Sequence, residues 1–283
     1  MYNMLKLELK NCLRRKEFKI IFTIIMAGVL MHFINEWHEL LIKDLTNVLG
    51  GYDHTVLQSV FPNPLLISIG SLMPLTCSLI YSDSYYTDIK NGIYKNIVTR
   101  TNRFNYVLSK IIITFTVSFL IIFIPLIIDQ ILCYMCFPFR GHMNYFGDPS
   151  YIYINTIYPD VQLHYMSIFH PYINNFIYIL INSLFGGLLA LLSLSISFVI
   201  KKNKYIIVLS SFIIFEIYKF ISEILPDIIE YLFNKSIDIS IVNGVLHPNN
   251  TTSKILLPCS VFVIVLVSTL LIYYGYKKDF NLE

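Results

Sequence analysis

The sequence predicts an all-α integral membrane protein with six transmembrane helices, forming a single transmembrane domain over residues 1–283. Three observations support this fold class: 55% of the residues are hydrophobic, only 14% are charged, and the apolar residues gather into six long runs. A soluble domain carries about 25% charged residues, and a chain this apolar would precipitate from water. We therefore expect a lipid bilayer around the chain and no nucleic-acid partner.

The bounds of the spans follow from the about 20 mostly apolar residues that a helix needs to cross the bilayer core. The spans are expected at about 18–35, 64–81, 107–128, 173–200, 205–225 and 255–274. The third is the clearest, because residues 111–128 carry no charge, and Asp129 is expected at its outer interface. Pro74 interrupts the second, which a membrane helix tolerates where neighbouring groups satisfy the freed backbone groups. Gly186 and Gly187 would let the fourth span pack closely against its neighbours.

Lysine and arginine residues indicate the orientation, because they are enriched in the cytoplasmic segments of membrane proteins. With the N-terminus in the cytoplasm, most of the 21 basic residues fall in cytoplasmic segments. An even number of spans then places the C-terminus in the cytoplasm as well. The frequent Ile, Asn, Lys, Tyr and Phe are typical of an AT-rich bacterium, so we expect the chain in a bacterial plasma membrane.

Two segments outside the spans have an amphipathic pattern. In residues 2–17, apolar side chains share one helical face and basic side chains crowd the rest, which suits a helix lying in the cytoplasmic leaflet or a plain topology signal. In the outer segment before the last span, apolar residues with helical spacing predict a short helix on the outer leaflet, beginning near Pro226. These residues are Ile228, Ile229, Leu232 and Phe233.

The loop between the second and third spans, residues 82–110, carries the most informative pattern. Asp88 could cap the start of a helix, and Gly92 permits a turn. The spacing that follows predicts a short amphipathic helix with an apolar face and a basic face. The two faces comprise Ile93, Ile97 and Val98, and Lys95 and Arg100. Such a helix could dock on a cytosolic partner or could belong to an ordinary positive-inside loop, and the pattern leaves both interpretations open.

Few residues suggest chemistry. Glu216 and Lys219 lie in the fifth span, where ionisable side chains are costly and often face a pathway, although at this spacing they could also form a structural pair. Cys133 and Cys136 form a C-x-x-C, which we interpret as buried thiols, because no second pair or histidine cluster accompanies them. Only His32 among the histidines falls within a span. The others are expected in outer segments, with irregular spacing that predicts no metal site.

The chain is similar to the permease subunits of ABC-2 type transporters, in the ABC transporter superfamily. The resemblance covers nearly the whole length and rests first on the topology described above. Its local part is the stretch Gly92–Arg103, Gly-Ile-Tyr-Lys-Asn-Ile-Val-Thr-Arg-Thr-Asn-Arg, followed by Tyr106 and Lys110. The closing segment Tyr276–Phe280 also resembles the usual ending of these subunits.

The resemblance implies a transport subunit that is not itself an enzyme. A separate P-loop ATPase would bind ATP and Mg²⁺, because this chain has no G-x-x-x-x-G-K-[ST] motif, and we expect no cofactor in the chain itself. A second permease chain, identical or related, would face this one around a path lined by Glu216 and Lys219. The cargo would be a peptide, an antimicrobial or a lipid-like amphiphile. The residues expected to dock on the ATPase are Asp88, Gly92, Ile93, Lys95, Ile97, Val98, Arg100 and Arg103.

Two other classes of function stay open. An intramembrane enzyme would need a converging set of catalytic groups at membrane depth, of which only Glu216 and Lys219 are evident. A non-transporting sensor or assembly protein would bind its ligand through the outer segments, of which the second is rich in tyrosine, histidine and proline.

Overall fold

The described part of the chain is a bundle of helices with one short strand pair. The structure is a computed structural model that describes residues 1–42, 47–57, 64–139, 142–143, 166, 169–200, 203–233 and 256–280. Its helices are α1 (Tyr2–Arg14), α2 (Lys16–Ile42), α3 (Pro64–Tyr81), α4 (Ser84–Lys90), α5 (Ile93–Val98), α6 (Arg103–Cys136), α9 (Pro171–Val199), α10 (Lys204–Phe233) and α12 (Leu256–Phe280). Strands β1 (Asn47–Val48) and β2 (His142–Met143) pair antiparallel.

Each predicted span falls on a helix. Within the part of the chain that is described, α2, α6 and α9 are long and apolar enough to cross a membrane, and the other predicted spans fall on α3, α10 and α12. The predicted bounds agree closely for α3 and α9, whereas α6 is longer than predicted at both ends. The start of α6 is set by Asn102, whose side-chain oxygen accepts a hydrogen bond of 3.0 Å from the backbone N–H of Phe104, as an N-cap residue does.

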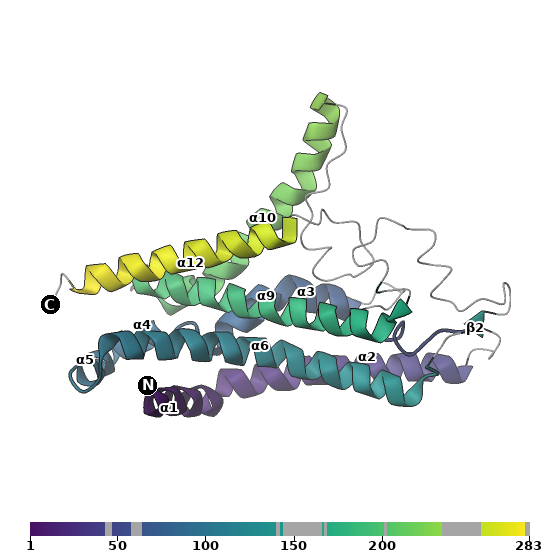
Figure 1. Ribbon diagram of the computed structural model, residues 1–283, viewed down its shortest axis with the longest axis horizontal. Coiled ribbons are helices and arrows are strands. Elements are labelled where there is room, and N and C mark those ends of the chain that lie inside the picture. The colour runs from purple at the N-terminus through teal and green to yellow at the C-terminus, as the bar shows by residue number, and fades with distance from the viewer. Residues whose placement is uncertain are drawn as a thin grey trace.

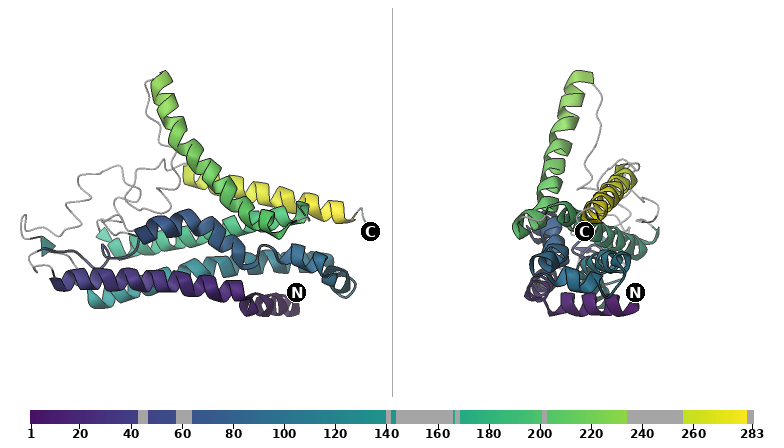
Figure 2. Two further views of the ribbon diagram at one scale, coloured as in Figure 1. Left: turned by 180° about the vertical axis from the view of Figure 1, so that it is seen from behind. Right: turned by 90° about the vertical axis from the view of Figure 1, so that its left-hand side faces the viewer.

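Most of the long helices lie along one common axis, and α10 is the exception. Figure 1 shows α2, α3, α6 and α9 running along the long axis of the molecule, with α12 beside α9. Both termini and α5 lie at one end, which we call the termini end, and β2 lies at the opposite end, which we call the far end. The views in Figure 2 show that α10 leaves the bundle and projects away from the other helices. The predicted topology also places the termini and the loop together.

Helix α9 packs closely against α3 and α6 because it carries two adjacent glycines. A Cβ atom added to Gly186 would lie 2.3 Å from Cδ1 of Ile122 on α6 and 3.0 Å from Sγ of Cys77 on α3. A Cβ atom added to Gly187 would lie 2.8 Å from the ring of Phe115. The prediction that these glycines allow close packing is confirmed.

Buried serines join the helices by hydrogen bonds, which are favourable between helices in apolar surroundings. The hydroxyl group of Ser78 on α3 donates to the carbonyl oxygen of Val208 on α10 over 2.8 Å. The hydroxyl group of Ser193 on α9 donates to the carbonyl oxygen of Ile207, also on α10, over 2.6 Å. These bonds hold the first half of α10 against the bundle.

Two predicted helix bounds are wrong. Residues 2–17 are not one helix, because α1 ends at Arg14, Arg15 is extended and α2 begins at Lys16. The fifth predicted span does not give way to a separate outer helix near Pro226, because α10 continues through this residue to Phe233. A proline removes a single backbone donor, which a membrane helix tolerates, so Pro226 does not mark a helix end. Residues 234–254 of the outer segment in which this helix was predicted lie outside the described residues.

Candidate functional site

The loop between α3 and α6 forms two short helices at the termini end. Helices α4 and α5 are joined through Gly92, whose φ of 70° lies in the left-handed region that favours glycine. The predicted short helix and the predicted turn are both confirmed. Asp88, by contrast, lies inside α4 and not at a helix start, and its partly buried carboxylate forms an ion pair with the buried Lys110.

A cluster of charged and phenolic side chains joins α1 to this loop. Near the start of α6, Nζ of Lys110 lies 3.2 Å from Oε2 of Glu8 on α1 and 2.7 Å from Oδ2 of Asp88 on α4. The hydroxyl group of Tyr81 donates to Glu8, and that of Tyr106 donates to Asp88. We call these residues the Lys110 cluster. Both Lys110 and Glu8 are almost fully buried, and buried charges are tolerated where they are paired and hydrogen-bonded, so the cluster fixes α1 against the loop and α6.

A second cluster surrounds Asp83, in the turn between α3 and α4. Arg15 forms an ion pair with Asp83 from the junction of α1 and α2. At the start of α10, Nζ of Lys204 lies 3.2 Å from Oδ2 of Asp83 and 3.4 Å from Oε1 of Glu17. Burial opposes the ionisation of Asp83, but Arg15 and Lys204 outweigh it and hold the pKa of Asp83 below its usual range. This Asp83 cluster joins the loop to the starts of α2 and α10.

Aromatic side chains continue these contacts from α5 into the bundle. The ring of Tyr94 on α5 lies 5.7 Å from that of Tyr106 on α6 and 5.8 Å from that of Tyr85 on α4. Tyr85 stacks on Phe198 of α9 with ring centroids 4.0 Å apart. Ile97 of α5 packs against the same group. Through these side chains α5 is therefore in direct contact with α6 and with the group that includes Phe198 of α9.

The predicted docking residues divide into a buried group and an exposed group. Asp88 belongs to the Lys110 cluster, and Arg103 is buried, with its guanidinium group donating to the carbonyl oxygen of Tyr276 on α12 over 3.0 Å. Ile97 and Val98 are partly buried. The exposed residues are Gly92, Ile93, Lys95 and Arg100. The exposed group offers a mixed apolar and basic surface, while the buried group connects that surface to the long helices.

The predicted path residues lie apart from this loop. Glu216 and Lys219 are on α10, and both are partly exposed beside the buried Phe215. Glu216 lies about 18 Å along the helix axis from Lys204, at 1.5 Å per residue. The fold does not bring these two residues to the loop clusters, and their role in a path stays a prediction.

A further cluster, which sequence reasoning missed, lies at the far end. His32 of α2 is almost fully buried between two carboxylates, with Nε2 3.6 Å from Oε1 of Glu36 and Nδ1 3.8 Å from Oδ1 of Asp129 on α6. Nδ1 of His54 lies 2.7 Å from Oε2 of Glu36. The backbone N–H of Val56 donates to Oδ2 of Asp129 over 2.8 Å. We call His32, Glu36, His54 and Asp129 the His32 cluster.

These clusters could have been found from single charged residues that differ in character from the residues around them in the sequence. Asp129 is the only charged residue in residues 111–136, and Glu8 is the only acidic residue in α1. Asp129 was expected at an interface with water, and that prediction is wrong, because its side chain is buried in the bundle. An ionisable residue inside an apolar helix is itself a sign of function, but the pattern cannot say which partner it meets.

Residues 50–57, which we call the plug segment, enter the far end of the bundle and are all buried. The backbone N–H of Gly51 donates to the carbonyl oxygen of Pro138 over 2.9 Å. The amide group of Asn175 on α9 donates to the carbonyl oxygen of Tyr52 over 3.0 Å. Non-helical backbone is stable at this depth only where protein groups satisfy it, and these bonds do so.

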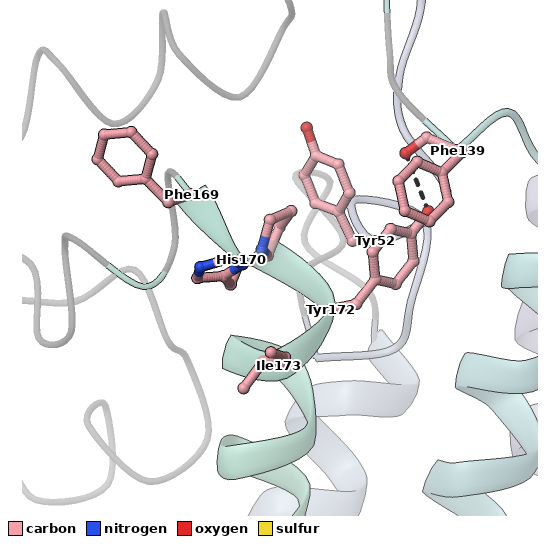
Figure 3. Close-up of a pocket in the computed structure, with 7 residues that line it drawn as sticks. Tyr52, Phe139, Phe169, His170, Tyr172 and Ile173 are labelled. Atoms are coloured by element: carbon pink, nitrogen blue, oxygen red, sulfur yellow. Dashed lines mark hydrogen bonds between the residues drawn. The ribbon is translucent and has the colours of Figure 1, made fainter.

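An aromatic cavity of about 370 Å³ lies beside the plug segment. Figure 3 shows Tyr172 next to Phe139, with a hydrogen bond of 3.1 Å from the Tyr172 hydroxyl group to the Phe139 carbonyl oxygen. The cavity is lined by Tyr52, Phe139, Phe169, His170, Pro171, Tyr172 and Ile173. Its lining is mostly apolar, as in sites for small apolar or aromatic groups.

No metal centre accompanies these clusters within the part of the chain that the structure describes. There, no group of three or more His, Cys, Asp or Glu side chains is placed to hold a metal ion. Cys133 and Cys136 are both free thiols. Cys133 is buried as predicted, whereas the prediction of a buried thiol is wrong for Cys136, which is exposed at the end of α6. The groups that the far end presents are the histidine and carboxylate side chains of the His32 cluster and the aromatic side chains of the cavity.

Comparison with known proteins gives one relative and no family. The chain is 29% identical over 143 residues, half of its length, to an uncharacterized protein, YybM, of Bacillus subtilis (strain 168). The match spans 54% of the length of that protein. No protein-family model matches the chain, and no solved structure matches it.

Proposed function

We propose that the chain is the membrane-spanning permease subunit of an ABC-2 type transporter in a bacterial plasma membrane. The observation that carries the proposal is the form of the loop at the termini end. Helix α5 presents an exposed apolar and basic surface, while residues in and around the same loop contact α1, α6, α9 and α10. This is the form that a docking element needs if it is to move the helices behind it.

In this proposal α2, α3, α6, α9, α10 and α12 are the six spans, and both termini lie in the cytoplasm. A separate P-loop ATPase binds ATP with Mg²⁺ and docks on α5. A second permease chain, identical or related, completes the transport path, and Glu216 and Lys219 of α10 line it. The cargo is a peptide, an antimicrobial or a lipid-like amphiphile.

The coupling route starts at the exposed surface of α5. ATP can shift the permease only if the ATPase contacts α5 differently in its ATP-bound and free states. Such a difference would act on Ile93 and pass through Tyr94 to α6 and through Ile97 to the aromatic group around Phe198. The Lys110 and Asp83 clusters would keep α1, α2 and α10 in place relative to the loop.

The test is a detergent pull-down of the tagged full chain, expressed with its neighbouring genes. Ile93→Asp places a charge on an exposed apolar contact, so we expect it to lose an ATPase that the unaltered chain recovers. Asn96→Asp is the matched control, because Asn96 is exposed on the same helix and gains the same charge without loss of an apolar side chain. We expect this variant to keep the ATPase.

The opposite result has an equally clear meaning. If the unaltered chain recovers no ATPase, and does not change the ATP hydrolysis of any neighbouring ATPase, the transport proposal fails. The intramembrane enzyme and the sensor or assembly protein would then remain. Glu216 would be the next residue to replace.

A further inference from the structure

His32 faces carboxylate oxygens with both of its ring nitrogens. Nε2 lies 3.6 Å from Glu36 and Nδ1 lies 3.8 Å from Asp129. A neutral imidazole has one N–H donor, and its other nitrogen is an acceptor with a lone pair. Either neutral tautomer would therefore direct a lone pair at an anionic oxygen. Only the imidazolium form presents a cation to both carboxylates, at distances of an ion pair and longer than those of a hydrogen bond.

The balance of charge in the His32 cluster leads to the same form. Among the described residues, the titratable groups beside His32 and its carboxylates include Glu36 on α2, Asp129 and Cys133 on α6, and His54 on the plug segment. Helices α3 and α9 carry no charged residue or histidine. With both imidazoles neutral, no cation would lie between the buried carboxylate of Asp129 and the partly exposed carboxylate of Glu36, and each negative charge would oppose the ionisation of the other.

We propose that the His32 cluster is a proton-binding site that holds the plug segment in the far end of the bundle. His32 carries the proton and, as an imidazolium, forms ion pairs with Glu36 and with Asp129. On its other oxygen, each carboxylate binds the plug segment, Glu36 through His54 and Asp129 through the backbone N–H of Val56. When the proton leaves to solvent, the two anions lose the cation between them and the plug segment is released.

This proposal does not depend on the transport function or on the cargo. It concerns the protonation state of one side chain and the closure of one segment, both of which can be measured in the isolated chain. A failure of the ATPase pull-down would leave it standing, and a failure of the tests below would leave the transport proposal standing.

The first test is the ¹⁵N spectrum of the full chain, labelled with ¹⁵N-histidine, in lipid nanodiscs. It is recorded at about pH 8, where an unperturbed imidazole with a pKa of about 6.5 is neutral. We expect one histidine with both nitrogens protonated, whose signal is missing in His32→Gln. The signal should remain in His38→Gln, because His38 is exposed on the same helix. A His32 ring with a single protonated nitrogen would overturn the proposal.

The second test measures release of the plug segment through Cys133. This thiol is buried behind the segment, with Sγ 3.5 Å from the carbonyl oxygen of His54. A chain with Cys133 as its only cysteine is labelled with a maleimide, and a chain with only the exposed Cys136 gives the reference rate at the same pH. We expect His32→Gln to raise the ratio of the two rates roughly tenfold or more, as when a buried anion loses its cationic partner.

The same assay keeps the proposal falsifiable if His32→Gln folds poorly. In the chain with His32 intact, raising the pH should increase the Cys133 labelling relative to Cys136, as the bound proton is lost. In Asp129→Asn, which removes one of the two anions, this dependence on pH should weaken. A Cys133 ratio that is the same at every pH in the unaltered cluster would contradict the proposal.

Discussion

At the scale of single residues, the ammonium group of Lys110 lies between Glu8 and Asp88 and out of contact with water. Lys110→Met keeps most of the volume of the side chain but leaves the buried carboxylate of Glu8 without its cation. We expect a loss of about 3–5 kcal/mol in the free energy of unfolding, the range for breaking a buried ion pair from one side. Thermal unfolding in detergent measures this, with Lys95→Met as the exposed control.

A double variant separates pairing from simple loss of packing. Glu8→Gln combined with Lys110→Met removes both charges of the first pair. Because residues in direct contact are energetically coupled, we expect the double variant to lose less stability than the sum of the two single variants. Strict additivity of the two losses would show that the pair contributes nothing of its own.

The Asp83 cluster predicts a loss of stability in acid. Arg15 and Lys204 hold the pKa of Asp83 below its usual range against the opposing effect of burial. A carboxyl group with a depressed pKa in the folded state adds stability that is present above its unfolded pKa, about 3.9, and is lost as the pH falls through the folded pKa. We expect the melting temperature to decrease when the pH is lowered below about 4.

The comparison for this prediction is Asp83→Asn. That variant should be less stable at neutral pH, because Arg15 and Lys204 lose their anion. Its melting temperature should then fall less on acidification than that of the unaltered chain. An equal fall in both would assign the acid sensitivity to other carboxyl groups.

Sequence reasoning located helix α5 but not the buried clusters, for a physical reason. Helical spacing fixes which residues share a face, so the pattern of Ile93 and Ile97 predicted α5 correctly. The partners of Lys110 lie on α1 and α4, and no local spacing relates residues so far apart in the chain. For Asp129, the same gap led to a prediction of exposure where the side chain is buried.

At the scale of elements, close packing of α9 depends on Gly186. A Cβ atom at this position would lie 2.3 Å from Ile122 and 3.0 Å from Cys77. Gly186→Val should therefore force α3, α6 and α9 apart and lower the free energy of unfolding by about 1–3 kcal/mol, as overpacking does. Chemical or thermal unfolding of the purified chain measures the loss.

Gly92→Ala is the informative comparison for that variant. No atom lies within 4 Å of a Cβ added to Gly92, but its φ of 70° disfavours any other residue, at roughly 1–2 kcal/mol. We expect a loss of this order from backbone strain alone, without disturbance of the core. A loss well above about 2 kcal/mol for Gly92→Ala would contradict the explanation from backbone strain, and no loss for Gly186→Val would contradict the explanation from overpacking.

The positions of the elements could be predicted more reliably than their ends. Apolar runs locate helices because burial in lipid demands apolar side chains. The run does not set where the backbone stops being helical, so α6 extends to Cys136 and α10 extends to Phe233 beyond the predicted spans. The start of α6, which also lies outside the predicted span, is set by the capping side chain of Asn102. The effect of such a group is visible only once the backbone geometry is known.

At the scale of the whole molecule, the termini end and the far end should lie on opposite sides of the membrane. A chain with Cys136 as its only cysteine exposes its thiol at the far end, and we expect a membrane-impermeant thiol reagent to label it in intact cells. A chain whose only cysteine comes from Asn96→Cys, on α5, should be labelled only after the membrane is permeabilised. Labelling of α5 in intact cells would invert or refute the proposed topology.

Helix α6 carries one residue of the Lys110 cluster and one of the His32 cluster. Lys110 lies near its start and Asp129 lies towards its end. The helix passes Pro125 without ending, and the two residues are about 28 Å apart along its axis. A ligand that moves α5 and a proton on His32 would therefore both act on helix α6. Thermodynamic linkage requires that the ligand on α5 changes the affinity of His32 for a proton by the same factor by which the proton changes the affinity of α5 for the ligand. An ATPase docking at the termini end would then register as proton uptake or release at the far end.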